Sequence, residues 1–231
     1  MLTLDGIVYR EGDFTLSADL GVPVGAKVAV IGPSGAGKST LLGMIAGFLP
    51  PENGRILWQG LDITALTPGQ RPIAMLFQDN NLFPHLTAAQ NIGLGIRADM
   101  RLGDDDHRAI DQALVRVGLE GLGGRKPGAL SGGQQSRVAL ARVLVQRRPL
   151  ILLDEPFAAL GPAQRNDMLD LVVALASETG ATLMMVSHEP RDAQRLGGQT
   201  ILVIGGRAAP PVDTDVLLAD PPEALRGYLG G

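Results

Sequence analysis

Short runs of apolar residues recur along the chain, and glycine-rich turns and longer segments with helical spacing separate them. The continuously apolar runs are Lys27–Ile31, Ile73–Phe77, Leu150–Leu153, Thr182–Val186 and Thr200–Ile204. Strands of a parallel sheet are buried on both faces, and an unbroken apolar pattern is typical of them. The alternation of such runs with helical segments therefore predicts an α/β fold with a mostly parallel core sheet.

Two stretches depart from this pattern. Leu2–Leu20 alternates apolar and polar residues around a polar turn, which predicts an antiparallel hairpin ahead of the core. Between residues 79 and 148 the sequence is helical and polar, which indicates a helical insertion. We therefore expect one domain over residues 1–231, with 1–78 and 149–231 forming the α/β core and 79–148 forming a helical subdomain. We expect the chain end from Asp220 onward to fray.

Composition excludes several classes of protein. Hydrophobic residues make up 45% of the 231 positions, which suffices for a large core and excludes disorder as the main state. Cysteine is absent, so disulfides, thiolate nucleophiles and cysteine-ligated zinc are excluded. The net charge of −4 provides no basic field for nucleic acid. Neither a membrane span nor a signal-peptide pattern is visible, so we expect a cytoplasmic location.

The strongest chemical signal is a glycine-rich loop. Residues 32–39 fit the pattern G-x-x-x-x-G-K-[ST], between an apolar run and a helix that we expect to begin at Thr40. Glycines let successive N–H groups turn toward phosphate oxygens, Lys38 adds positive charge at the β- and γ-phosphates, and the Ser39 hydroxyl is a ligand for Mg²⁺. A chance glycine-rich loop is the alternative, and the flanking strand and helix disfavour it. The predicted ATP-binding residues of this segment are Gly32, Pro33, Ser34, Gly35, Ala36, Gly37, Lys38, Ser39 and Thr40.

Two adjacent carboxylates, Asp154 and Glu155, end the apolar run that begins at Leu150. At the carboxyl edge of the sheet, Asp154 can hold the Mg²⁺ hydration shell and Glu155 can polarise the attacking water. The alternative is that two acids end a strand because the next turn is solvated. The nearby phosphate loop favours the catalytic interpretation.

A helix start at Ser131 carries a second signal. Ser131 and Gln134 form a capping-box pattern, which by itself explains both residues. It does not explain Gly132 and Gly133, which cost helix stability in the first turn. Two glycines there suit a phosphate that approaches the backbone closely.

Gln78 and His188 each follow a predicted strand. The amide oxygen of Gln78 can reach Mg²⁺ or the attacking water, and His188 can contact a γ-phosphate oxygen and the catalytic carboxylate. Alone, each is better interpreted as a polar strand end or a structural histidine. Parallel strands place both at the edge that holds Asp154, and this favours a catalytic role for both.

Together these segments resemble the ATP-binding-cassette (ABC) ATPases over the whole chain. Residues 32–40 resemble the family's Walker A motif and residues 151–155 its Walker B motif, while residues 130–134 resemble its signature. Gln78 and His188 match its Q-loop and H-loop. The resemblance implies a head-to-tail homodimer with two ATP sites. In each site the Walker residues of one chain face residues of the partner chain that match Ser131, Gly132, Gly133 and Gln134.

The resemblance also implies an aromatic residue that stacks on adenine, and Tyr9 stands at about the right distance upstream. The alternative for Tyr9 is packing on a face of the hairpin. One position departs from the family, because Gly161 stands where an acid usually helps to couple the two sites.

Residues 75–95 and 45–56 resemble the ATPase subunits of bacterial thiamine importers. Importers for iron(III), polyamines, sulfate or molybdate have similar sequences and remain alternatives. The resemblance implies transmembrane permease subunits, a periplasmic solute-binding protein as an indirect partner, and a peripheral position on the cytoplasmic face of the inner membrane. A soluble cassette ATPase that acts on DNA or ribosomes usually has a long insertion or a second cassette, and a P-loop kinase would not need the signature.

Overall fold

The computed structural model describes residues 1–223, 225 and 226. Half of the segment expected to fray, residues 224 and 227–231, lies outside the described residues. In the described half, Leu225 is buried and its N–H donates to the carbonyl oxygen of Pro222. The strands are β1 (Leu2–Glu11), β2 (Phe14–Val22), β3 (Lys27–Ile31), β4 (Asn53–Trp58), β5 (Leu61–Asp62), β6 (Ile73–Leu76), β7 (Leu150–Asp154), β8 (Thr182–Val186), β9 (Gln199–Ile204), β10 (Arg207–Ala208) and β11 (Val212–Asp213). The helices are α1 (Lys38–Ala46), α2 (Ala88–Gly93), α3 (Asp104–Arg116), α4 (Gly132–Leu144), α5 (Pro162–Thr179), α6 (Pro190–Leu196) and α7 (Thr214–Ala219), with short 3-10 turns at Pro68–Gln70 and Pro127–Ala129.

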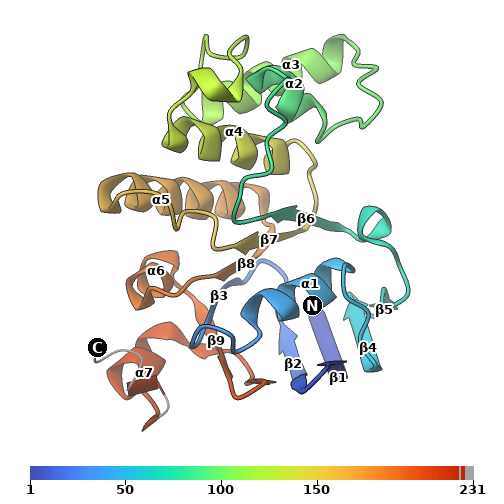
Figure 1. Cartoon of the computed structure of the whole chain (residues 1–231), viewed down its shortest axis with the longest axis vertical. Helices are drawn as coiled ribbons and strands as arrows, with labels where there is room; N and C mark the ends of the chain where they lie inside the picture. The colour runs from blue at the N-terminus through green and yellow to red at the C-terminus, as the bar shows by residue number, and fades with distance from the viewer. Residues whose placement is uncertain (224, 227–231) are drawn as a thin grey trace.

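The core of the sheet is parallel, as the apolar runs predict. Strands β9, β3, β8, β7 and β6 lie side by side in this order, and every neighbouring pair in this group is parallel (Figure 1). The carboxyl ends of these strands therefore meet along one edge. The five predicted runs agree with the observed strands to within one residue at each end.

The predicted hairpin forms the other part of the sheet. Strands β1 and β2 pair antiparallel, with Leu2 opposite Val22 and Glu11 opposite Phe14. Strand β4 adds to the free edge of β1 in antiparallel register, and β5 pairs with β4. The sequence analysis missed β4, because only its second half is buried and its apolar signal is short.

The parallel sheet is covered on both faces. Along β7, Leu150 and Leu152 pack in a cluster with α1 and the hairpin, while Ile151 and Leu153 pack in a second cluster with α4, α5 and α6. Successive side chains of a strand point to opposite faces, so a continuous apolar run fills both clusters. Figure 1 shows α1 beside the hairpin strands, and α5 on the side of the sheet nearer to α4.

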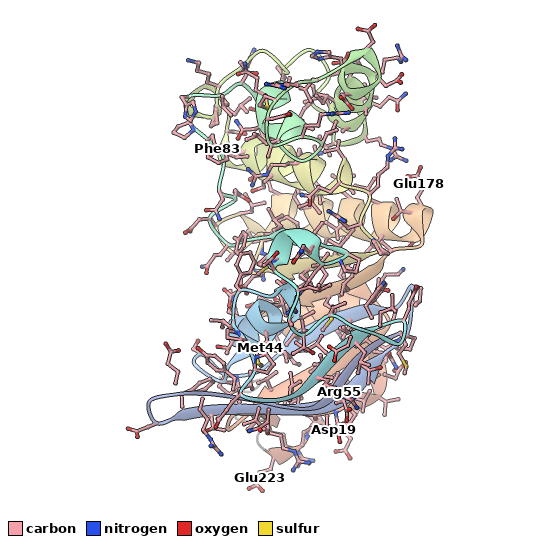
Figure 2. The ribbon with its side chains drawn as sticks, turned by 90° about the vertical axis from the view of Figure 1, so that its right-hand side faces the viewer. Asp19, Met44, Arg55, Phe83, Glu178 and Glu223 are labelled. Atoms are coloured by element: carbon pink, nitrogen blue, oxygen red, sulfur yellow. The ribbon has the colours of Figure 1, made fainter. Side chains whose placement is uncertain are left out.

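The chain between β6 and β7 contains α2, α3 and α4 and no strand among the residues that the structure describes. It has a separate apolar cluster that includes Ile92, Leu114 and Val138. Figure 2 shows this part at one end of the molecule, marked by Phe83, with the strands that carry Asp19 and Arg55 at the other end. We keep the division at residues 79–148 as a proposal. Within the described residues, no helix combines the length and apolar character needed to cross a bilayer.

Helix α1 begins two residues earlier than predicted, at Lys38 rather than Thr40. The reason is Gly37, whose left-handed backbone (φ 105°) ends the loop and starts the helix. The other end of α1 is held by Arg71, a fully buried residue. Its guanidinium donates to the carbonyl oxygens of Met44 and Ile45 at 2.8 and 2.7 Å, and thereby satisfies acceptors that a helix C-terminus leaves open.

Candidate functional site

The loops at the carboxyl edge of the sheet bring together four of the predicted residues. The Ser39 hydroxyl, at the start of α1, donates to Oδ1 of Asp154 at the end of β7, over 2.9 Å. Nδ1 of His188, which follows β8, lies 3.3 Å from Oε2 of Glu155. Three separate strands therefore deliver a hydroxyl, two carboxylates and an imidazole to one place.

Two glycines of the loop after β3 are required by its geometry. A Cβ on Gly32 (φ 152°) would lie 2.0 Å from the carbonyl oxygen of Val203, and one on Gly37 would lie 2.8 Å from Cζ of Phe14. The tight curl also leaves α1 without a side-chain cap. The first N–H groups of a helix have no partner inside the helix, so this end is suited to an anion.

Lys38 is the cation of the loop and is 6% exposed. Its Nζ donates to the carbonyl oxygens of Gly32 and Pro33 at 2.9 and 3.0 Å, so the side chain folds back over the loop. Burial lowers the pKa of Lys38, and the negative charges of Glu155 and Asp154 oppose that shift. A buried cation without a direct carboxylate contact is well placed to receive phosphate oxygens.

Asp154 is partly buried beside this cation. Burial raises the pKa of Asp154, the hydrogen bond from Ser39 lowers it, and the charge of Glu155 raises it further. Ser39 and Asp154 offer a hydroxyl and a carboxylate, the hard oxygen ligands that Mg²⁺ prefers. The described residues contain no cluster of three or more His, Cys, Asp or Glu side chains that could hold a metal ion. This donor set fits an Mg²⁺ that takes its other ligands from phosphate and water.

A pocket of about 380 Å³ lies over the loop, and Phe14, Ser34, Gly35, Gly37, Lys38, Ser39, Thr40 and Glu155 line it. Phe14 is an aromatic residue that the sequence analysis did not consider. Tyr9 is not among the lining residues, and its hydroxyl donates to Oε2 of Glu11 at 3.1 Å. Stacking of Tyr9 on adenine stays a prediction, and Phe14 is a second candidate for that contact.

Several predicted site residues are not among the lining residues of this pocket. Asp154 and His188 are joined to it through Ser39 and Glu155, and Gly32, Pro33 and Ala36 belong to the loop beneath it. Gln78 and the signature residues have no such link to the lining residues among the contacts of the described residues. Gln78 is exposed in the turn after β6 and is not among the lining residues. Ser131 caps α4 as predicted, because its Oγ accepts from the N–H of Gln134 at 3.3 Å and its own N–H donates to Oε1 of Gln134 at 3.0 Å. A Cβ on Gly132 would meet nothing within 4 Å. A Cβ on Gly133 would lie 3.4 Å from Oε1 of Gln164, so the helix start is open at Gly132 and bordered by Gln164 at Gly133.

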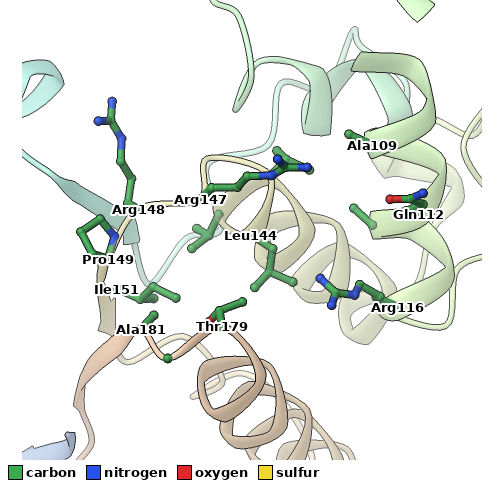
Figure 3. A pocket seen from close by; sticks show the side chains of 14 residues that line it. Ala109, Gln112, Arg116, Leu144, Arg147, Arg148, Pro149, Ile151, Thr179 and Ala181 are labelled. Carbon is green, nitrogen blue, oxygen red and sulfur yellow. The ribbon is translucent and has the colours of Figure 1, made fainter. Parts of the chain in front are cut away.

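A second hollow holds none of the predicted site residues. It has a volume of about 490 Å³ and lies between α3, the end of α4, the start of β7 and the end of α5 (Figure 3). Figure 3 shows Ile151 and Ala181 on one side of it and Gln112 and Arg116 on the other. The start of β7 is the end of that strand opposite to Asp154. We therefore assign the chemistry to the smaller pocket.

The loop that carries His188 is fixed by a buried group that the sequence analysis missed. Asp192 of α6 accepts a hydrogen bond from the Ser187 hydroxyl at 2.6 Å and forms an ion pair with Arg165 of α5. Ser187 Oγ also accepts from the N–H of Glu189 at 2.9 Å. Asp192 and Arg165 thus fix the residues on either side of His188 in the chain. No short motif signals this contact, because the partners lie 27 positions apart.

Comparison with known proteins places this geometry in a family. A family model described as "ABC transporter" matches residues 16–158. The thiamine import ATP-binding protein ThiQ of Cereibacter sphaeroides is 60% identical over 230 residues, which cover 100% of both chains. The protein of the same name from Ruegeria sp. is 59% identical, again over 100% of both chains, and that from Brucella suis is 49% identical over 99% of this chain and 95% of its own.

Solved structures agree with these relatives. A dimeric post-hydrolysis structure of the ATP-binding cassette MJ0796, bound to ADP and Pi, has a TM-score of 0.80 and 30% identity over 93% of this chain and 99% of its own. The cbiO1 protein of Clostridium perfringens, part of the ABC transporter complex cbiONQ, has a TM-score of 0.84 and 30% identity, over 98% of this chain and 93% of its own. The match of the family model and the full-length relatives show that this chain belongs to the ABC transporter family.

Proposed function

We propose that this chain is the ATP-hydrolysing subunit of an importer for thiamine. The observation that carries the hydrolytic part is the convergence of Lys38, Ser39, Asp154, Glu155 and His188 at one sheet edge. Relatives named for thiamine import, up to 60% identical over the full chain, support the solute.

Binding of the triphosphate follows from the loop after β3. The uncapped start of α1 offers backbone N–H groups to phosphate oxygens. Lys38 exchanges its two carbonyl contacts for contacts with the β- and γ-phosphates, where its charge offsets the charge that develops as the bond breaks. Burial lowers the pKa of Lys38, and the negative charges of Glu155 and Asp154 oppose that shift and so favour the charged form.

Hydrolysis needs a water molecule in line with the γ-phosphorus. In this proposal Glu155 accepts a proton from that water as its oxygen attacks, and the bond to the bridging β–γ oxygen breaks to release ADP. His188 lies 3.3 Å from Glu155 and holds this carboxylate in place while it contacts a γ-phosphate oxygen. Gln78 would contact the attacking water only after the turn that follows β6 moves toward the pocket.

Ser39 and Asp154 are the residues that would hold Mg²⁺, with Gln78 as a further oxygen ligand. The ion supplies charge neutralisation at the β- and γ-phosphates. The hydrogen bond between Ser39 and Asp154 holds these two side-chain oxygens 2.9 Å apart, beside the phosphate loop where the ion would bind.

The second half of each ATP site comes from the partner chain in this proposal. The helix start is open at Gly132, and none of Ser131, Gly132, Gly133 and Gln134 is among the lining residues of the pocket of their own chain. The related cassette MJ0796 is described as a dimer bound to ADP and Pi. A head-to-tail homodimer brings the signature of each chain onto the nucleotide of the other.

We further propose that the chain is peripheral to the inner membrane, on its cytoplasmic face, and that transmembrane permease subunits hold it there. A periplasmic solute-binding protein would be an indirect partner. The exposed Phe83, in the turn that follows Gln78, supports a docking surface on this loop.

The test is uptake of radiolabelled thiamine into proteoliposomes that contain the permease subunits and the solute-binding protein, with ATP inside. We expect uptake with the wild-type chain and none with Lys38→Ala. Uptake of iron(III), a polyamine, sulfate or molybdate in place of thiamine would reassign the solute and keep the ATPase role. ATP hydrolysis that responds to nucleic acid and not to the permease would overturn the importer role.

A further inference from the structure

The loop that follows Gln78 is attached to the signature helix at two points. The first is near the start of α4, where Nδ2 of Asn80 donates to the Ser136 hydroxyl at 3.2 Å. That hydroxyl donates in turn to the carbonyl oxygen of Gly132, a signature residue, at 3.2 Å. One short chain of hydrogen bonds therefore joins the loop to the backbone of the signature.

The second attachment is Arg142, near the end of α4. One of its terminal nitrogens donates to the carbonyl oxygen of Asn80 at 2.7 Å, and the other donates to that of Asn81 at 2.8 Å. Arg142 is half-buried, and burial lowers the pKa of its guanidinium. The two carbonyl oxygens replace part of the water that this half-buried cation has lost, so losing them would carry a cost.

The backbone of the loop is shaped for this contact. Asn80 and Asn81 both have a left-handed backbone, with φ of 55° and 45°. Asparagine tolerates this conformation better than most residues. Two consecutive left-handed residues place successive carbonyl oxygens where one planar guanidinium reaches both. A lysine at position 142 carries a single nitrogen and cannot hold this pair in the same way.

We propose that Arg142 is a positioning residue that makes the loop after Gln78 and the signature helix α4 move as one body. A rigid element attached at two points along its length resists both translation and rotation. When the loop is displaced, Ser131–Gln134 at the start of the helix therefore move with it. The inference rests on the proposed function, because a partner subunit must push on the loop for the movement to matter.

The test compares Arg142→Lys with Arg137→Lys as a matched control. Arg137 lies on the same helix and donates to one backbone carbonyl oxygen, that of Val117, at 2.8 Å. Hydrogen exchange of the amides of residues 79–82 is followed by mass spectrometry on the isolated full chain. We expect exchange at least about fivefold faster in Arg142→Lys, because the loop opens on its own, and no change there in Arg137→Lys.

The second measurement is the stimulation of ATP turnover by the permease subunits in proteoliposomes. In Arg142→Lys this stimulation should fall at least about fivefold, while the KM for ATP of the isolated chain stays within about twofold of wild type. Arg137→Lys should keep both values. A purely structural role would lower the activity of the isolated chain as much as the stimulation.

Unchanged exchange at residues 79–82 in Arg142→Lys, or equal effects of the two lysine variants, would overturn the proposal. If Arg142→Lys does not fold, Ser136→Ala and Asn80→Gly replace it. The first removes the other attachment, and the second keeps the left-handed backbone without the amide. A wild-type chain that does not respond to the permease subunits would count against the proposed function, whereas hydrogen exchange still decides whether the attachment exists.

Discussion

The phosphate loop and the signature turn both sit at helix starts, yet they differ in how complete they are within one chain. At the start of α1, Lys38 and Ser39 already have partners, namely two carbonyl oxygens and Asp154. At the start of α4, Ser131 is used only to cap its own helix, and Gly132 faces open space. The fold therefore gives the first region its polar partners, whereas the second region has a partner only in the proposed dimer.

The difference has an energetic side. The cost of burying Lys38 and Asp154 is partly offset inside the chain by the contacts just described. The two glycines in the first turn of α4 also cost stability relative to alanine, and the capping box of Ser131 and Gln134 offsets only part of that cost. The proposed contact with a nucleotide held by a partner chain gives these two glycines a reason.

Glu155→Gln should have the largest effect, and it acts on the region of the phosphate loop. Turnover of ATP should fall by at least ~10²-fold, because a general base contributes about that much. Binding of ATP should persist, since glutamine keeps the shape of the side chain. Single-turnover hydrolysis and nucleotide binding check the two parts, with the exposed Glu120→Gln as control. A fully active Glu155→Gln enzyme would remove Glu155 from the role of base.

Gly132→Ala tests the start of α4. We expect the variant to be more stable than wild type and less active in ATP turnover. A Cβ there meets nothing within 4 Å, so alanine should stabilise the folded chain by about 0.5–1 kcal/mol. ATP turnover should nevertheless fall by roughly 10–100-fold, because the methyl group keeps the nucleotide at a distance from the backbone. Chemical denaturation and steady-state ATPase assays measure the pair of effects.

Gly128→Ala is the control for that experiment. It lies in the neighbouring 3-10 turn, and a Cβ there also meets nothing within 4 Å. Its ATPase activity should match wild type. Equal losses of activity in both alanine variants would show that the glycines of this region serve chain geometry rather than nucleotide approach.

Asp154→Asn should raise the stability of the nucleotide-free chain while it abolishes Mg²⁺-dependent hydrolysis. Burial raises the pKa of Asp154 above its ordinary value of 3.8, so the folded chain binds this proton more tightly than the unfolded chain. Folded wild type therefore loses stability as the pH rises through that raised pKa, and asparagine avoids this loss. We expect a higher melting temperature for Asp154→Asn than for wild type at neutral pH, measured without nucleotide or Mg²⁺.

The pH dependence supplies the control. Below pH 3.8 both states of wild type carry the proton, so the advantage of Asp154→Asn should vanish there. Asp170→Asn should show the opposite sign, because the hydrogen bond from Arg195 lowers the pKa of Asp170. A stability gain of Asp154→Asn that is the same at every pH would contradict this explanation.

Gly161→Asp should have the smallest effect on the nucleotide site. Gly161 caps the start of α5 with an extended backbone (φ −64°), and a Cβ there meets nothing within 4 Å. Aspartate is also a good N-cap, so stability should rise by only a few tenths of a kcal/mol. Equilibrium binding of ATP should be unchanged. A large loss of affinity would show that this loop belongs to the nucleotide site of its own chain.

Local patterns in the sequence predict many residues of the site. They predict few of the contacts that keep those residues in position. The apolar runs predict the parallel strands to within a residue, and the phosphate loop follows from its motif and flanks. Helix α1 begins at Lys38 rather than Thr40, because the left-handed Gly37 sets the start.

Contacts between distant residues explain what the sequence did not predict. Phe14 rather than Tyr9 lines the pocket, and that depends on how the hairpin lies over the loop. Arg71 and Arg165 each act on residues more than twenty positions away. Such buried polar contacts leave no periodicity along the chain, so only the folded structure shows them.

The central claim is that each nucleotide lies between the phosphate loop of one chain and the signature of another. Mixing two inactive variants, Lys38→Ala and Ser131→Arg, tests it most directly. Random pairing makes half of the dimers mixed, and each mixed dimer holds one intact site, so ATP turnover should recover to about a quarter of wild type. A mixture no more active than its separate components, measured at a concentration where wild type is fully active, would contradict the account.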